Sequence, residues 1–294
     1  MLATETPSAQ HTELDLYPTH QLIDVLIDDQ FAAVHAVRAA GPQITDAITQ
    51  ALPRILQGGR LIYVGAGTSG RLGVLDSVEL FPTFSWPTER AIGILAGGSQ
   101  AMFNAIEGAE DDALQGAKDL LAVQLQKNDV VVLLAASGTT PYVMGALQAA
   151  RDAGALTIGI ANNVDAPLAT AADIGITLNT GNEIISGSTR LKAATAQKIA
   201  LNTFSSGLMI KLNKVYGNLM VDFKPTNAKL LRRAVSLTMF ATGCDEASAN
   251  NMLAQCKYHV KTALVALLNR SSIAEAQEQL ELSNGNVRNA LKRN

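Results

Sequence analysis

The sequence has few cysteines and few aromatic residues. Only two of its 294 residues are cysteines, Cys244 and Cys256, and it contains neither a CxxC pair nor another metal-ligand spacing. The four histidines are scattered along the chain, and aromatic residues make up only 4% of it. This composition predicts neither a disulfide framework nor a metal site. We therefore expect a protein that works without metal in the reducing cytoplasm.

Long apolar runs and an excess of basic residues are also absent. No apolar run approaches the roughly 18 residues of a membrane span, and the polar start MLATETPSAQHTELD lacks the basic and apolar regions of a signal peptide. With 23 Lys and Arg against 26 Asp and Glu, the net charge is −3, which argues against a nucleic-acid partner. The residues that are present, 48% hydrophobic and 17% charged, are typical of a globular protein.

From Arg60 onwards, short apolar runs alternate with helical patterns. Each run has the length of a strand that is buried on both faces. Helical patterns between most of the runs favour an α/β fold with a parallel sheet of about five strands. Sheets of this kind bind ligands at the carboxyl ends of their strands. The expected strands are Leu61–Val64, Ala91–Leu95, Val130–Ala135, Leu156–Ile160 and Ile174–Leu178.

Helical patterns precede and follow the expected sheet. Residues 18–56 carry apolar residues at helical spacing with a break at Gly41-Pro42, whereas residues 1–16 are expected to be loosely ordered. After about Ile184 the pattern is helical throughout. It includes one long amphipathic helix over 192–211, whose apolar stripe needs a partner surface.

The same patterns predict three parts of the chain. These are an N-terminal helical segment over 1–50, an α/β domain over 51–225 and a small C-terminal helical bundle over 226–294. In the bundle, Thr242-Gly243 is expected to separate two helices, and a short third helix is expected after Asn284-Gly285. A DNA-binding helix-turn-helix is an alternative for the bundle, which the lack of a basic stripe disfavours.

The first expected strand runs into a glycine-rich loop, GAGTSGR, at residues 65–71. Its GxGxxG spacing before a helix is a weak signal for a dinucleotide, but the second strand ends in Ala96-Gly97-Gly98, with no acidic residue to hold a ribose. Hydroxyl groups and helix N-terminal amides in the loop favour a phosphate or sugar phosphate instead, and a purely structural turn is the remaining alternative. The candidate ligands are Gly67, Thr68 and Ser69.

A second hydroxyl-rich loop, ASGTTP, follows the third expected strand at residues 136–141. Pro141 suits the first turn of a helix, and an ordinary N-cap would need only one of the hydroxyl residues before it. Two such loops at adjacent strand ends would point at one spot. The second loop therefore adds Ser137, Thr139 and Thr140 to the candidate phosphate ligands.

Carboxylates that could transfer protons occur in two places. Glu79 lies in the helix expected after the first loop, and four more acidic residues lie in Glu107-Gly108-Ala109-Glu110-Asp111-Asp112. Each could equally be a solvated surface carboxylate, and spacing alone does not choose among Glu107, Glu110, Asp111 and Asp112.

A polar, cationic segment, SGSTRLK at residues 186–192, opens the long helix. Its cationic side chains could hold a phosphate or a carboxylate, and the alternative is a helix cap with flanking charge. The candidate binding residues here are Ser188, Arg190 and Lys192.

Together these motifs resemble one known family. The strings GAGTSGRLGVLDSVE, AIEGAEDD, AASGTTPYV and ISGSTRLKAATAQK followed by KVYGNLMVD resemble the N-acetylmuramic acid 6-phosphate etherases, and the likeness runs from about residue 20 to the end. These enzymes share the sugar isomerase (SIS) domain with sugar-phosphate isomerases and the vertebrate glucokinase regulatory protein. The resemblance implies an SIS-type fold, which is a flavodoxin-like three-layer sandwich. It also implies a cytoplasmic homodimer that uses neither a metal nor a nucleotide cofactor.

The resemblance also implies an activity and two catalytic residues. The family converts N-acetylmuramic acid 6-phosphate and water to N-acetylglucosamine 6-phosphate and D-lactate, in the salvage of bacterial cell-wall amino sugars. Its proton donor is matched here by Glu79, and its second active-site glutamate by Glu110. The chain departs from the family where Thr139 replaces a common Arg, and where Glu5-Thr6-Pro7-Ser8 replaces an Arg-Asn-Pro string.

For this family the expected chemistry is elimination followed by hydration. When the sugar opens to its aldehyde, a base removes the acidified C2 proton while an acid protonates the ether oxygen at C3. Lactate leaves, and water adds at C3. Two alternatives on the same fold are a sugar-phosphate isomerase and a non-catalytic sugar-phosphate sensor; the presence of both Glu79 and Glu110 favours the enzyme over the sensor.

Overall fold

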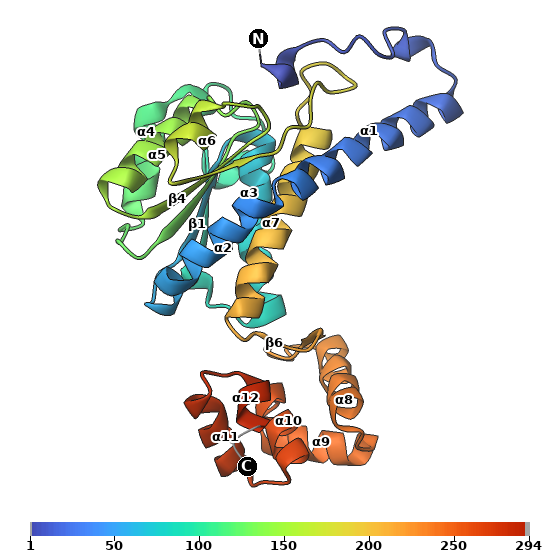
Figure 1. Ribbon diagram of the computed structural model, residues 1–294, viewed down its shortest axis with the longest axis vertical. Helices are drawn as coiled ribbons and strands as arrows, with labels where there is room; N and C mark the ends of the chain where they lie inside the picture. Colours follow the sequence, from blue (N-terminus) through green and yellow to red (C-terminus); the bar gives the residue numbers. More distant parts are fainter. Residues whose placement is uncertain (1, 292–294) are drawn as a thin grey trace. The chain divides into compact units, whose positions relative to one another are not determined.

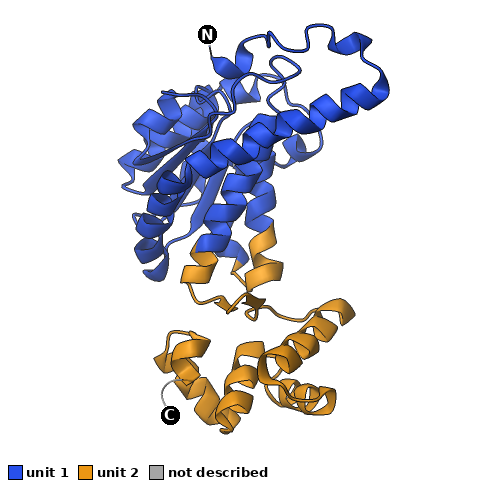
Figure 2. Cartoon of the chain, turned by 45° about the vertical axis from the view of Figure 1, so that its right-hand side comes forward, with its two compact units in different colours: residues 1–78, 88–207 blue, residues 79–87, 208–294 orange. Residues whose placement is uncertain are grey.

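The computed structural model describes residues 2–291 and divides the chain into two compact units. Unit 1 consists of residues 1–78 and 88–207, and unit 2 of residues 79–87 and 208–294 (Figure 2). Each unit has its own buried apolar core. Two helices, α3 (Gly67–Phe84) and α7 (Lys192–Lys211), run across the boundaries between the units.

Unit 1 is built on a five-stranded parallel sheet with the order β2-β1-β3-β4-β5. This confirms the expected α/β sheet, and each strand matches its expected range to within one residue at its carboxyl end. Three of the strands, β1, β3 and β4, are buried along their whole length, as strands covered on both faces must be. The strands are β1 (Leu61–Gly65), β2 (Ala91–Leu95), β3 (Val130–Leu134), β4 (Leu156–Ala161) and β5 (Ile174–Thr177).

Helices cover both faces of this sheet and complete the three layers (Figure 1). On one face lie α4 (Ala113–Ala122), α5 (Pro141–Asp152) and α6 (Pro167–Ala171), and on the other lie α2 (Gly41–Leu56), α3 and α7. The next strand in the chain after β1, which is β2, lies on one side of β1. Strands β3, β4 and β5 follow one another on the other side, so the direction of strand order reverses between β1 and β3. This reversal point is where open α/β sheets form ligand crevices.

The N-terminal helices follow the expected pattern. Helix α1 (Thr19–Ala39) ends just before the Gly41-Pro42 break, and α2 begins at Gly41. The long helix predicted over 192–211 is α7, and the Lys192 ammonium at its start forms an ion pair with Asp29 of α1 at 2.6 Å. Within residues 2–291, no helix combines the length and apolar character needed to cross a membrane.

The expectation of loose order over residues 1–16 is wrong for the start of the chain. Two short 3-10 helices, η1 (Ala3–Glu5) and η2 (Leu14–Leu16), precede α1. Thr4 is fully buried, and its backbone N–H donates to the side-chain oxygen of Asn163. The partner lies 159 residues away along the chain, which is why no local sequence pattern could reveal this contact.

The part of unit 2 that follows α7 begins with a feature that the sequence did not predict, because only helices were expected after Ile184. A two-stranded antiparallel hairpin joins β6 (Val215–Tyr216) to β7 (Leu219–Met220). Its two-residue turn is Gly217-Asn218, and Gly217 has a φ of +60°, a conformation that glycine adopts without strain. The Gly-Asn pair was the available signal for this hairpin.

Five helices follow the hairpin, more than the sequence predicted. Gly243 ends the first of them with a φ of +74°, at the expected break. Two further breaks occur at Lys257-Tyr258 and at Arg270, where residues other than glycine adopt positive φ. No Gly or Pro marks these turns, so the pattern concealed them. The helices are α8 (Ala228–Thr242), α9 (Glu246–Gln255), α10 (Val260–Asn269), α11 (Ile273–Leu282) and α12 (Val287–Leu291); the last three residues of the bundle expected over 226–294 lie outside the described residues.

Candidate active site

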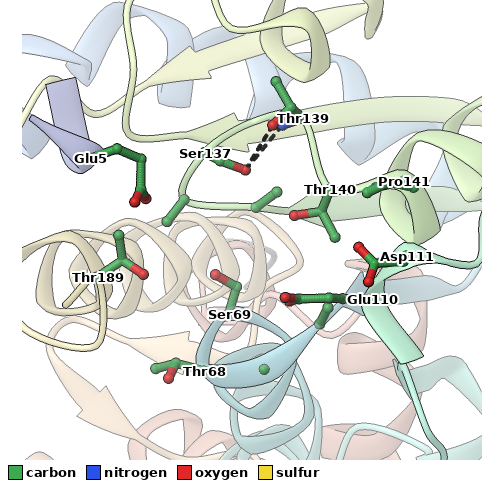
Figure 3. Close-up of a pocket in the computed structure, with 14 residues that line it drawn as sticks. Glu5, Thr68, Ser69, Glu110, Asp111, Ser137, Thr139, Thr140, Pro141 and Thr189 are labelled. Atoms are coloured by element: carbon green, nitrogen blue, oxygen red, sulfur yellow. Dashed lines mark hydrogen bonds between the residues drawn. The ribbon is translucent and has the colours of Figure 1, made fainter. Parts of the chain in front are cut away.

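A cavity of about 420 Å³ lies at the carboxyl edge of the sheet in unit 1, where the loops after β1 and β3 meet (Figure 3). Both hydroxyl-rich loops line it, as do two residues of the acidic segment, so the structure brings these separately identified motifs together. The lining residues are Glu5, Ala66, Gly67, Thr68, Ser69, Glu110, Asp111, Ala135, Ala136, Ser137, Thr139, Thr140, Pro141 and Thr189.

The loop after β1 turns sharply into α3. A Cβ atom on Gly65 would lie 2.7 Å from the Gly70 backbone, and one on Gly70 would lie 2.5 Å from the Gly65 carbonyl oxygen, so only glycine fits at both positions. This close approach places Gly67, Thr68 and Ser69 at the cavity wall in the first turn of α3. Backbone N–H groups in a first helical turn have no intrahelical acceptor and can bind an anion.

The loop after β3 presents three hydroxyl groups to the same cavity. Ser137 Oγ accepts hydrogen bonds from the backbone N–H and the hydroxyl of Thr139, both at 3.2 Å (Figure 3). Thr140 is the N-cap residue of α5, yet its side chain forms no capping hydrogen bond. Pro141 occupies the first turn of α5, as predicted. The Thr140 side chain therefore does not act as an ordinary helix cap, and its hydroxyl is available to a ligand.

The structure separates the four carboxylates of the acidic segment. Glu110 and Asp111 line the cavity, whereas Glu107 lies outside it. Asp112 caps α4, because its side chain accepts a hydrogen bond from the Gln115 backbone N–H at 2.9 Å. Glu110 thus lies beside the hydroxyl loops, and its catalytic role stays a prediction.

Glu79 does not share this cavity. It is exposed on α3, ten residues beyond Ser69, which corresponds to about 15 Å along a helix with 1.5 Å rise per residue. Leu75 and Val78 on the same helix are also exposed, at 42% and 63%. Glu79 is the first residue of unit 2, whereas the cavity and Glu110 belong to unit 1.

The segment before α7 contributes one lining residue, Thr189, which was not among the predicted binding residues. Ser188, Arg190 and Lys192 are not among the lining residues, and the Lys192 ammonium is paired with Asp29. A ligand role for these three residues stays a prediction.

The start of α7 is capped from within unit 1. The buried Glu183 carboxylate accepts hydrogen bonds from the backbone N–H groups of Lys192 and Ala193, at 3.1 and 2.9 Å. Burial raises the pKa of Glu183, and the two amide hydrogen bonds oppose that shift. The amides at the start of α7 are thus satisfied within the protein, and these two are not available to an anion.

Glu5 is a second lining residue that was not predicted from the sequence to belong to the site. It belongs to η1, and its side chain points into the cavity (Figure 3). No periodicity or motif marks it, because its place depends on the distant contact between Thr4 and Asn163.

The lining has an unusual balance of charge for an anion site. It contains the carboxylates of Glu5, Glu110 and Asp111 but no Lys, Arg or His among the described residues. An anion in this cavity would have to be bound by neutral hydroxyl and amide donors at the N-termini of α3 and α5. Among the described residues, no group of three or more His, Cys, Asp and Glu side chains could hold a metal ion.

Comparison with known proteins identifies the family. The chain is 55% identical to the N-acetylmuramic acid 6-phosphate etherase of Deinococcus radiodurans, over 98% of this chain and 94% of the relative. It is 46% identical to the protein of the same name from Klebsiella aerogenes, over 99% and 97% of the two chains. The chain belongs to the N-acetylmuramic acid 6-phosphate etherase family.

Two further comparisons agree on the fold of this etherase family member. Residues 43–151 match the glucokinase regulatory protein N-terminal SIS domain, and residues 112–206 match the SIS domain. A phosphoheptose isomerase structure from Francisella tularensis superposes with a TM-score of 0.51 and 17% identity, covering 66% of this chain and 100% of that one. The expected SIS-type fold is confirmed.

A substitution at Thr140 distinguishes a ligand from a helix cap. We expect Thr140→Ala to change the free energy of unfolding by less than about 0.5 kcal/mol, because its side chain makes no capping bond. Asp112→Ala removes a real cap from α4 and should cost about 1 kcal/mol. Urea unfolding measures both, and calorimetry with inorganic phosphate should show about tenfold weaker binding for Thr140→Ala alone. Equal destabilisation by the two substitutions would contradict the ligand role.

Proposed function

We propose that this protein is a carbon–oxygen lyase that removes D-lactate from N-acetylmuramic acid 6-phosphate and leaves N-acetylglucosamine 6-phosphate. The observation that carries the proposal is the cavity itself, where two hydroxyl-rich helix N-termini and Glu110 face one space. The relatives from Deinococcus radiodurans and Klebsiella aerogenes bear the name of this activity.

In this proposal the 6-phosphate lies against the two loops. Thr68 and Ser69 at the start of α3, and Ser137, Thr139 and Thr140 before α5, supply neutral donors. A phosphate bound by hydroxyl and amide groups leaves no cation beside the acidic residues, which could otherwise form ion pairs with it. The carboxylates of the cavity then remain free to act on the sugar.

The chemistry proceeds by elimination and hydration. In the open-chain aldehyde the C2–H bond is acidified by the neighbouring carbonyl, and a base takes this proton while an acid protonates the ether oxygen at C3. The C3–O bond breaks, D-lactate leaves with the ether oxygen, and water then adds at C3 as a proton returns to C2. We assign ether protonation to Glu79, and assistance in C2 proton removal or water activation to Glu110.

We propose that each site takes its two glutamates from two copies of the chain. Within one chain, Glu79 lies about 15 Å along α3 from the cavity wall at Ser69. The exposed apolar side chains of Leu75 and Val78 flank Glu79 on this helix and are suited to lie against a partner. We therefore propose a homodimer in which Glu79 of one copy serves the cavity of the other.

A second exposed apolar stripe supports a dimer, and it lies on α1 instead of on the long helix whose stripe was expected to need a partner surface. The apolar face of α7 is already buried within the chain, for example at Ala196, Ala200 and Phe204, so it needs no partner copy. On α1, by contrast, four apolar side chains at helical spacing are about half exposed. These are Ile23, Ile27, Phe31 and Val34.

The two cysteines agree with the location that we propose for this enzyme. Cys244 and Cys256 are both free thiols, the ordinary state of cysteine in the cytoplasm, where we place this enzyme.

A sugar-phosphate isomerase on the same fold would exchange the C2 proton but release no lactate. A D-lactate assay with N-acetylmuramic acid 6-phosphate therefore decides between the two activities.

Substitutions in the acidic segment test the choice of glutamate. Glu110→Gln should lower kcat for D-lactate release by at least about 100-fold, because the amide cannot exchange a proton, while leaving the affinity for the sugar phosphate within about tenfold. Glu107→Gln is the matched control, since Glu107 lies outside the cavity, and it should stay within about threefold of wild type. Greater impairment of the control would mean that Glu107 is the catalytic residue.

Isotopic labelling tests which bond breaks. In ¹⁸O-labelled water the label should appear at C3 of N-acetylglucosamine 6-phosphate and not in the lactate hydroxyl, because elimination cuts the bond on the sugar side. In deuterated water the product should carry deuterium at C2. Mass spectrometry of both products reads the result, and label in the lactate hydroxyl would instead indicate displacement at the lactyl carbon.

Mixing two inactive variants tests the shared site. Glu79→Gln and Glu110→Gln should each be inactive alone. When subunits are exchanged, half of the dimers are mixed and each mixed dimer regains one intact site, so about a quarter of wild-type activity should return. Light scattering should show a dimer before and after exchange. If exchanged dimers regain no activity, Glu79 does not act on the partner's cavity.

A further inference from the structure

The start of the chain is anchored at the carboxyl edge of the sheet by specific contacts. The backbone N–H of Thr4 donates to Asn163 Oδ1 at 3.2 Å, and the Asn163 amide donates back to Thr4 Oγ1 at 3.0 Å. Thr4 is fully buried and Asn163 is 2% exposed. A third bond, from the Ser8 backbone N–H to Ser186 Oγ at 3.2 Å, holds the segment to the loop before α7.

The same asparagine also holds the hydroxyl loop. The Asn163 amide donates to the Ala136 carbonyl at 3.0 Å and approaches that of Ser137 at 3.4 Å. The loop after β3 and the start of the chain are thus positioned by one buried side chain. A segment that is tied to the wall of the cavity in this way belongs to the site.

This anchor decides where Glu5 lies. Glu5 follows the buried Thr4 within the single turn of η1, and its side chain extends into the cavity. In Figure 3 its carboxylate lies beside Thr189, across the cavity from Glu110 and Asp111. Glu5 is exposed, and its carboxylate has no hydrogen-bond or ion-pair partner among the described residues. An anchored, unpaired carboxylate that faces a cavity is placed to accept hydrogen bonds from a ligand.

The charge of Glu5 determines which part of a sugar phosphate it can meet. A carboxylate repels a phosphate group, which in this cavity is bound by the hydroxyl loops, but accepts hydrogen bonds from sugar hydroxyl and amide N–H groups. We propose that Glu5 is a substrate-binding residue that accepts hydrogen bonds from the hydroxyl groups of the sugar, on the side opposite Glu110, and that Thr4 and Asn163 hold it there. The identity of the sugar rests on the proposed function; the role of Glu5 in recognising it is the new element.

The decisive experiment compares two ligands by calorimetry, N-acetylglucosamine 6-phosphate and inorganic phosphate. Glu5→Gln should weaken binding of the sugar phosphate about ten- to a hundredfold, as expected for lost hydrogen bonds to a charged group, while phosphate binding stays the same or tightens. Glu13→Gln is the control, because Glu13 is an exposed carboxylate of the same segment outside this cavity, and it should bind both ligands as wild type does. Unchanged sugar-phosphate affinity in Glu5→Gln, or equal weakening for both ligands, would overturn the proposal.

Kinetics and a double mutant separate binding from other roles. Glu5→Gln should raise KM for D-lactate release with kcat within about threefold, since Glu5 contacts groups that do not react. A loss confined to kcat would refute a binding role.

Thr4→Val removes the hydroxyl that Asn163 holds and should weaken sugar binding less than Glu5→Gln does. Adding Thr4→Val to Glu5→Gln should have no further effect on that affinity, and a full additive loss would show that Thr4 does not act through Glu5. If wild type releases no lactate but the calorimetric difference persists, the proposed reaction fails while the role of Glu5 stands.

Discussion

The site depends on one constraint, which is that β1 and β3 are hydrogen-bonded neighbours although β2 lies between them in the sequence. Gly65 pairs with Leu134 at the ends of these strands, so the two loops that follow open at the same edge. Helices α3 and α5 then leave on opposite faces of the sheet (Figure 1). The loops must therefore diverge, and the space between them is the cavity.

The cavity combines anion binding with free carboxylates. Its donors are hydroxyl and amide groups at two helix N-termini, and the only charged side chains among its described lining residues are Glu5, Glu110 and Asp111. A lysine or arginine in the lining would bind phosphate more strongly, but it would also pair with these carboxylates and lower their basicity. Thr139, a neutral hydroxyl residue of the lining, is consistent with this mode of phosphate binding.

Two consecutive asparagines after β4 connect the site to the rest of unit 1. The fully buried Asn162 donates to the Leu178 and Ala193 carbonyls and accepts from the Gln197 amide, which fixes the start of α7. Asn163 holds the start of the chain and the loop after β3. A single dipeptide thus positions segments from both ends of the unit, which explains how a terminal residue such as Glu5 acquires a defined place.

The sequence by itself determined the parallel sheet, the two hydroxyl-rich loops and the long helix α7, because these depend on local apolar runs, glycines and helix-start residues. The choice of Glu110 came from resemblance, since spacing left four carboxylates equivalent; only the fold showed that Asp112 is a cap and that Glu107 lies outside the cavity. Turns at Lys257-Tyr258 and Arg270 were also missed, because residues other than glycine take up the positive φ there. Tertiary structure alone decided that Glu5 and Thr189 join the cavity and that Lys192 is paired with Asp29. The physical reason is that each of these outcomes depends on a contact between residues far apart in the chain, which the local pattern around a residue does not encode.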